Sequence, residues 1–136
     1  MVKRRSLRQV GLLAVSMLAT AIWSVNAQAA CTIKVGVIST FEGAFAVLGP
    51  ESFRGAELAV NEFGGKAGGC DIELIKGSSD ARPDVAIAAA RKLIENDNVD
   101  ILVGPLSGSE GLAMKEYAKT QPNKTFVNGI SAAQDT

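Results

Sequence analysis

Hydrophobic and polar positions alternate along the chain in a way that predicts strands and helices in turn. Short runs rich in β-branched and aliphatic residues predict strands at 32–38, 71–76, 101–103 and 125–127. Between them, apolar residues recur every three or four positions, which predicts amphipathic helices. The predicted apolar stripes are Phe53, Ala56, Val60 and Phe63 in the first helix, Val85, Ala89 and Leu93 in the second, and Ala113, Met114, Tyr117 and Ala118 in the third.

Prolines and glycines mark the ends of these elements. Pro50 and Pro83 each suit a first helical turn, so the first helix is expected to follow a loop at 39–49. Gly64 and the glycine after it end that helix. Residues 77–80 (GSSD) have the composition of a turn after the second strand.

The repeating order of strand and helix predicts an α/β fold with an open, doubly wound parallel sheet. In such sheets ligands bind outside the carboxyl ends of the strands, where the strand order reverses. If the four predicted strands lie in the order 2-1-3-4, the loops at 39–49, 104–109 and 128–133 meet at that place.

The stretch around residue 107 carries the clearest local signal. Ser107 and Glu110 have the S-x-x-E spacing of a capping box, which begins a helix directly after the third strand. The free N–H groups of a first helical turn, together with the helix dipole, can bind an anion such as a carboxylate. A simple helix cap with no ligand is the alternative interpretation of the same spacing.

The first thirty residues have the features of a secretory signal peptide. Four basic residues and no acidic residue precede an uncharged, mostly apolar run at 10–23, and Ala27 and Ala29 form a small-x-small cleavage site. The apolar run is too short for a membrane span. We therefore expect residues 1–30 to be a signal peptide that is removed on export.

Removal of this segment changes the charge balance. The whole chain has 14 basic and 14 acidic residues, and without the four basic residues of the leader ten face fourteen, a net charge of −4. A mildly acidic exported domain gives no indication of a nucleic-acid partner.

Cys31 and Cys70 are the only cysteines, and both lie in the exported part. An oxidising compartment favours a disulfide between them. Each directly precedes a predicted strand, so parallel pairing of those strands would bring both to one edge of the sheet. The alternative is lipidation of Cys31, which follows Ala30, although Gln28 stands where a lipoprotein signal usually has leucine.

The sequence lacks the usual signatures of an enzyme. The chain has no histidine to act as a general base, and residues 104–108 (GPLSG) do not form the G-x-S-x-G nucleophile turn. No G-x-G-x-x-G follows the first strand, and no cluster of Cys and His offers a metal site. We expect a protein that is not an enzyme and has no cofactor.

Several segments, in this order and spacing, resemble a known family. They are 33–38 (IKVGVI), 42–49 (EGAFAVLG), 54–61 (RGAELAVN), 88–94 (AAARKLI), 103–109 (VGPLSGS) and 128–133 (NGISAA). Together they make the mature chain similar to the N-terminal part of the periplasmic leucine/isoleucine/valine-binding proteins of ABC importers.

This resemblance implies a receptor that holds a small carboxylate-bearing solute between two lobes and delivers it to a membrane permease. The positions that match the family's ligand-binding loops are Leu48, Ser107, Gly108, Ser109, Ser131 and Ala132. Leu48 falls where branched-chain binders often have an aromatic wall, and Gly108 falls where they offer a serine. The ligand therefore stays open between aliphatic amino acids, amides and aromatic acids.

Members of this family are longer and have a second lobe. The resemblance implies that residues 31–136 form an N-terminal lobe, and that the second lobe is absent from this sequence. The ligand-sensing domain of a receptor, which uses the same lobes, is the alternative function.

Overall fold

The computed structural model describes residues 31–129 and 131–134, so the predicted signal peptide at 1–30 lies outside the described residues. The strands are β1 (Thr32–Thr40), β2 (Lys66–Ala67), β3 (Cys70–Ser79), β4 (Ile101–Val103) and β5 (Thr125–Val127). The helices are α1 (Leu48–Glu62), α2 (Pro83–Arg91) and α3 (Gly108–Ala118), with a 3-10 turn η1 (Gly43–Phe45) and a π-helical turn η2 (Lys92–Asn96).

The strands form one sheet in the order β2-β3-β1-β4-β5. Strand β1 lies in the middle and pairs in parallel with β3, from Thr32 opposite Asp71 to Thr40 opposite Ser79. It also pairs in parallel with β4, which in turn pairs in parallel with β5. The predicted parallel α/β sheet and its 2-1-3-4 strand order are therefore confirmed. The short β2 was not predicted, and it pairs antiparallel with β3.

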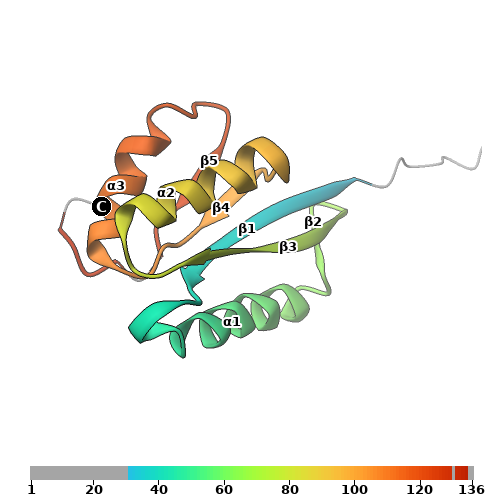
Figure 1. The fold of residues 1–136 in the computed structure, drawn as a ribbon. Helices are drawn as coiled ribbons and strands as arrows, with labels where there is room; N and C mark the ends of the chain where they lie inside the picture. The colour runs from blue at the N-terminus through green and yellow to red at the C-terminus, as the bar shows by residue number, and fades with distance from the viewer. Residues whose placement is uncertain (1–30, 130, 135–136) are drawn as a thin grey trace, which may run out of the picture.

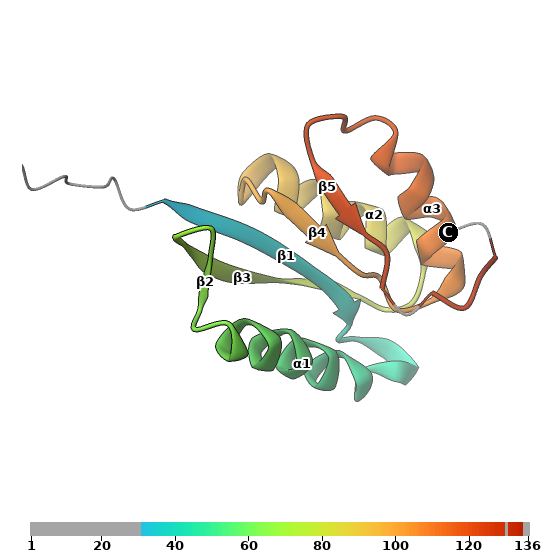
Figure 2. The same cartoon turned by 180° about the vertical axis from the view of Figure 1, so that it is seen from behind.

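Helices cover the two faces of the sheet unequally. Helices α2 and α3 pack side by side on one face, and α1 lies alone on the other, beneath β1 and β3 (Figures 1 and 2). None of the helices in the described ranges is long and apolar enough to cross a membrane.

The helical segment of α2 and η2 contacts the sheet through Leu93, a fully buried residue of η2. A Cβ atom built on Gly36 would lie 2.9 Å from Cδ1 of Leu93, and one built on Gly77 would lie 2.8 Å from the same atom. Since both distances are shorter than real Cβ contacts, the two glycines of neighbouring strands form the hollow that the leucine fills. Larger residues there would push the helix layer away from the sheet.

Two of the sequence expectations on this face were wrong. Residues 77–79 continue β3 instead of forming a turn, because Gly77 pairs with Ile38 in register and makes room for Leu93. The buried side of α2 is formed by Ala86 and Ala90, one position after the predicted Val85 and Ala89. Because alanine side chains are small, they allow α2 to approach the sheet closely, and hydrophobicity alone does not predict this.

The first helix also differs from its prediction. It begins at Leu48, two residues before Pro50, and β1 extends to Thr40. Phe63, which was expected in the apolar stripe, follows the last helical residue and is 78% exposed. Phe53 instead packs edge to face against Phe41, with 6.4 Å between the ring centroids.

The two cysteine sulfurs are bonded to one another, with 4.7 Å between the Cα atoms of Cys31 and Cys70. The bond closes a loop of 39 residues that contains β1, α1 and β2. We predict that replacing both cysteines by serine lowers the free energy of unfolding by about 4 kcal/mol, because the open chain gains entropy when unfolded. Urea denaturation of the oxidised protein and the variant measures this difference, and equal midpoints would contradict it.

The partly buried Tyr117 makes the free energy of unfolding depend on pH in the alkaline range. Its ring contacts Phe126 edge to face at 6.2 Å, and its hydroxyl is buried with no hydrogen-bond partner among the described residues. Burial raises the pKa of Tyr117, Glu95 adds to the rise, and Arg91 opposes it. A raised pKa means that the neutral tyrosine favours folding below about pH 10, and that this contribution is lost as pH rises through the folded-state pKa.

We predict that Tyr117→Phe keeps or raises the free energy of unfolding at pH 7, by up to about 1 kcal/mol, because it removes an unpartnered buried hydroxyl. Above pH 10 the variant should lose stability with pH less steeply than the parent protein. Chemical denaturation at pH 7, 9, 10 and 11 measures both effects. A steeper loss in the variant would show that Tyr117 does not connect folding to alkaline pH in this way.

Candidate functional site

The carboxyl ends of β1, β4 and β5 lie at one edge of the sheet, where α3 also begins (Figures 1 and 2). The strand order reverses here, because the chain runs from β1 to β3 on one side and then returns to β4 on the other. The loops that the sequence analysis selected therefore leave the sheet at a topological switch point, the usual place for a ligand in such folds.

Ser107 is the N-cap of α3, and the predicted capping box is present in full. The N–H of Glu110 donates to Ser107 Oγ at 3.4 Å, and the N–H of Ser107 donates to Glu110 Oε2 at 3.1 Å. The hydroxyl of Ser107 also donates to Glu110 Oε2 at 2.7 Å. The side chain of Ser107 is thus engaged within the protein.

The next two residues present free donors. No acceptor for the N–H groups of Gly108 and Ser109 is found among the described residues, as expected for a first helical turn. Ser109 is exposed, and its Oγ lies 3.4 Å from Ser107 Oγ. Two backbone donors, one hydroxyl and the positive end of a helix dipole are arranged as in sites that bind anions.

The loop after β5 packs directly on the start of α3. A Cβ atom on Gly108 would lie 3.0 Å from both N and Cβ of Ala133, so a larger residue at 108 would push this loop away. Ser131 is half-buried, and its buried Oγ has no hydrogen-bond partner among the described residues. Ala132 is exposed. The structure therefore brings the 131–133 segment and Gly108 together, as the family resemblance implied.

Leu48 belongs to a groove on the face of the sheet that carries α1. The groove has a volume of about 600 Å³ and lies between α1 and the ends of β1 and β4. Residues that line it include Ser39, Leu48, Ala56, Val103, Leu106 and Gly129. Leu48 is 41% exposed, and the described lining does not include Ser107, Gly108 or Ser109. Leu48 thus lines a groove next to the 104–106 segment that leads into α3.

Two hydroxyl groups at the end of β1 were missed by the sequence analysis. Ser39 and Thr40 are almost completely buried, and neither side-chain oxygen has a partner among the described residues. Ser39 also lines the groove beside Leu48. Both residues directly follow the apolar run of the predicted first strand, and this position could have indicated that they are buried. The sequence analysis instead placed them in the loop at 39–49.

Gly104 lets the chain turn from β4 toward α3. Its φ is +110°, and a Cβ atom there would lie 2.1 Å from the carbonyl oxygen of Ile38. Only glycine fits a backbone that is both in this conformation and this close to a neighbouring strand. This close approach fixes the point at which the 104–109 loop leaves the sheet.

The charged side chains around this edge are mostly paired. Arg82 donates to Asp80 at 2.8 Å, and this hydrogen bond and the charge of Asp80 raise the pKa of Arg82. Ser78 donates to Glu42 at 2.7 Å. In the described ranges, no group of three or more Cys, Asp or Glu side chains is placed to hold a metal ion. The donors at the start of α3 are thus the main features available to a ligand.

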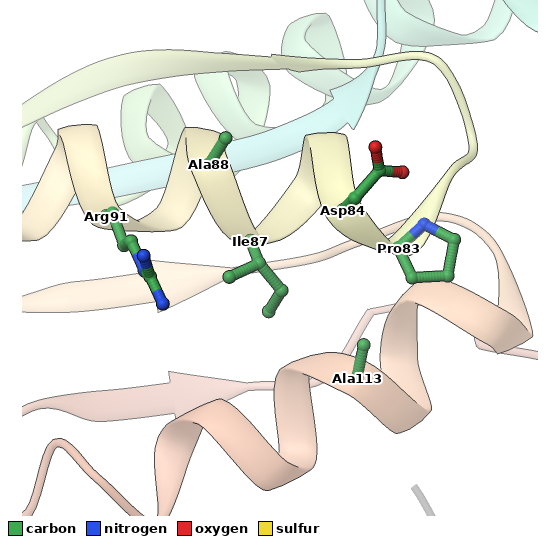
Figure 3. A pocket seen from close by; sticks show the side chains of 6 residues that line it. All are labelled: Pro83, Asp84, Ile87, Ala88, Arg91 and Ala113. Carbon is green, nitrogen blue, oxygen red and sulfur yellow. The ribbon is translucent and has the colours of Figure 1, made fainter.

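A second hollow, of about 520 Å³, lies between α2 and α3 (Figure 3). It is lined by Pro83, Asp84, Ile87, Ala88, Arg91 and Ala113. None of the predicted site residues lines it.

Sequence reasoning also missed the full role of Glu110. The S-x-x-E spacing identified its capping bond, but Ser79 also donates to Glu110 Oε1, and Glu110 is completely buried. Ser79 lies 31 positions earlier in the chain. No local pattern connects residues so far apart.

Known relatives of this chain are named as amino-acid-binding proteins. The chain is 35% identical over 112 residues to the "Leu/Ile/Val-binding protein homolog 7" of Brucella abortus (strain 2308). The match covers 81% of this chain and 28% of the relative, so the chain spans little more than a quarter of that protein's length.

Solved structures show the same architecture. The solute-binding protein of an ABC transporter from Rhodopseudomonas palustris BisB5, in complex with 3,4-dihydroxybenzoic acid, has a TM-score of 0.64 and 30% identity. That match covers 71% of this chain and 26% of the other. The branched-chain amino acid binding protein LivJ from Streptococcus pneumoniae, in complex with isoleucine, has a TM-score of 0.68 at 24% identity, covering 76% of this chain and 30% of LivJ, and supports the fold alone.

The family model described as "Periplasmic binding protein" matches residues 32–136, which is most of the sequence. Its members are solute-binding proteins and not enzymes. The described fold, the helix start at the switch point and this match agree, and the chain belongs to the periplasmic binding protein family.

Proposed function

We propose that this chain is part of an exported substrate-binding receptor of an ABC importer that takes up a small carboxylate-bearing solute. The observation that carries the proposal is the start of α3, where Gly108 and Ser109 present free N–H groups at the switch point of the sheet. In a family of solute-binding proteins, such a group of donors suits the carboxylate of a ligand.

The residues around this helix start suit the rest of a small ligand. The hydroxyls of Ser109 and Ser131 can hydrogen-bond polar groups next to the carboxylate, because neither is engaged by a charged partner among the described residues. Leu48, the first residue of α1, offers an apolar wall in the neighbouring groove. The ligand would thus have one anionic end and one apolar end.

Two classes of solute fit this description. Branched-chain amino acids are favoured by the similarity to a Leu/Ile/Val-binding protein homologue. Aromatic acids are favoured by the 30% identity to a protein solved with 3,4-dihydroxybenzoic acid, and by Leu48 in place of the family's aromatic wall. Both classes have the carboxylate that the start of α3 would bind.

The proposed mechanism needs a second lobe. The chain spans 28% of the length of its Brucella relative. We propose that residues 31–136 are the N-terminal lobe, and that a ligand held by it bridges to the other lobe and favours the closed form. The closed receptor would deliver its solute to a membrane permease from the periplasm, after export directed by residues 1–30.

The carboxylate of the solute is predicted to supply much of the binding affinity. Full-length protein should bind leucine or isoleucine, or benzoate or 3,4-dihydroxybenzoate, and should bind the matching amide at least about 100-fold more weakly, which is about 2.7 kcal/mol. The amide lacks the charge that the helix start attracts. Isothermal titration calorimetry with leucine against leucinamide, and benzoate against benzamide, measures this. An amide that binds as tightly as its acid would contradict the proposed site.

Bulky substitutions at Ser109 and Ser131 test the position of the site. Ser109→Phe and Ser131→Phe should each lower affinity by at least about 100-fold, because the ring fills the space of the ligand. Thr120→Phe is the matched control, since Thr120 is exposed just beyond the other end of α3. Circular dichroism checks that all three variants are folded. If both site variants bind as the parent does, the ligand lies elsewhere.

A further inference from the structure

Glu110 is the one charged residue that is buried in the part of the chain that the structure describes. Its relative exposure is 0%, although it lies in the first turn of a helix that begins at the surface. A buried carboxylate is costly unless hydrogen bonds replace the lost water. The hydrogen-bond partners of Glu110 therefore indicate what the buried carboxylate does in the fold.

Three hydrogen bonds satisfy this carboxylate. Oε2 accepts from the N–H of Ser107 at 3.1 Å and from the hydroxyl of Ser107 at 2.7 Å, and Oε1 accepts from the hydroxyl of Ser79. No lysine or arginine forms an ion pair with Glu110 among the described residues. The charge is thus held by neutral donors and by the positive end of the α3 dipole.

These bonds join two loops that are not neighbours in the sheet. Ser79 ends β3, Ser107 follows β4, and β1 lies between those two strands. A second contact supports the same connection, because Ser107 Oγ lies 3.4 Å from the carbonyl oxygen of Ala81 and the N–H of Ala81 donates to Ser79 Oγ at 3.3 Å. Glu110 therefore spans the end of β1.

The hydroxyl of Ser107 has a single hydrogen to donate. The 2.7 Å distance to Glu110 Oε2 is much shorter than the 3.4 Å distances to Ala81 and to Ser109, so the hydrogen goes to Glu110. The same oxygen accepts the N–H of Glu110. Ser107 is thus fully engaged, while Ser109 and the N–H groups of the first turn are free to bind.

We propose that Glu110 is a positioning residue for ligand binding. It holds the 104–109 loop against the end of β3, so that Gly108 and Ser109 face the ligand and Ser107 stays inside the protein. This inference rests on the proposed function and assigns a new role to a residue that does not contact the ligand. It also changes the role of Ser107 from ligand contact to support.

The test uses Glu110→Gln in the full-length protein, with Glu116→Gln as the matched control. Glu116 is exposed on the same helix and pairs with Lys119 at 2.7 Å. Glutamine keeps the size of Glu110 but has one acceptor oxygen instead of two and no charge, so only one of Ser79 and Ser107 can keep its bond to an acceptor oxygen and the attraction to the α3 dipole is lost. NMR should show that the amide protons of Ser107 and Glu110, which the capping box bonds, exchange at least 10-fold faster in Glu110→Gln and unchanged in Glu116→Gln.

Ligand affinity is the second readout, measured with whichever of isoleucine or 3,4-dihydroxybenzoate the parent protein binds. Glu110→Gln should lose at least 10-fold in affinity, and Ser79→Ala should lose less. The double variant should be no weaker than Glu110→Gln alone, because both changes break the same bond. Ser78→Ala is the control for Ser79, since Ser78 is bonded to Glu42 instead.

Val99→Ala tests whether any loss of core stability lowers ligand affinity. Val99 is 1% exposed and lies two residues before β4, at the opposite end of that strand from Ser107. At a temperature where all variants are folded, Val99→Ala should bind as the parent does. Unchanged amide exchange in Glu110→Gln, fully additive losses, or an equal loss in Val99→Ala would each overturn the proposal. If the parent binds neither solute, the proposed function fails, and the exchange data still decide whether Glu110 positions the loop.

Discussion

The buried carboxylate of Glu110 is the contact on which the carboxyl edge of the sheet depends. It joins the end of β3 to the start of α3 across the end of β1, through Ser79 on one side and Ser107 on the other. Gly104 sets where the chain leaves β4, and Glu110 sets where the helix that follows is anchored. Together they place the free N–H groups of the first turn at the switch point. The ligand site can thus be formed by backbone groups that a side-chain search overlooks.

Helices α2 and α3 support the sheet from one of its two faces (Figures 1 and 2). Leu93 fills the hollow over Gly36 and Gly77, which fixes the layer of α2 and α3 on the sheet. The face that carries α1 is less completely covered, and a groove of about 600 Å³ follows the ends of β1 and β4. The two faces therefore have different roles. One is a packed core that supports the site, and the other leaves apolar surface beside it.

Much of this fold could be predicted from the sequence, because hydrophobic periodicity and the prolines and glycines at the ends of elements are local signals. The succession of strands and helices and the capping box of Ser107 follow from patterns within a few residues. Three features could not be found in this way. Gly77 looked like a turn until its contact with Leu93 was known, the buried side of α2 was shifted by one residue toward Ala86, and Ser79 is 31 positions from Glu110. Each depends on a contact between distant segments, so sequence patterns could select the loops at this end of the sheet but not the contacts that support them.

The central claim is that this protein is a receptor for a small carboxylic acid. Native mass spectrometry of the protein purified from its export compartment tests it most directly, because ions formed gently retain a bound solute. We expect a complex that carries one small acid and loses it on collisional activation, with the acid identified as an amino acid or an aromatic acid. A protein that carries no such acid, and takes up none when mixed with leucine, isoleucine, benzoate and 3,4-dihydroxybenzoate, would contradict the claim.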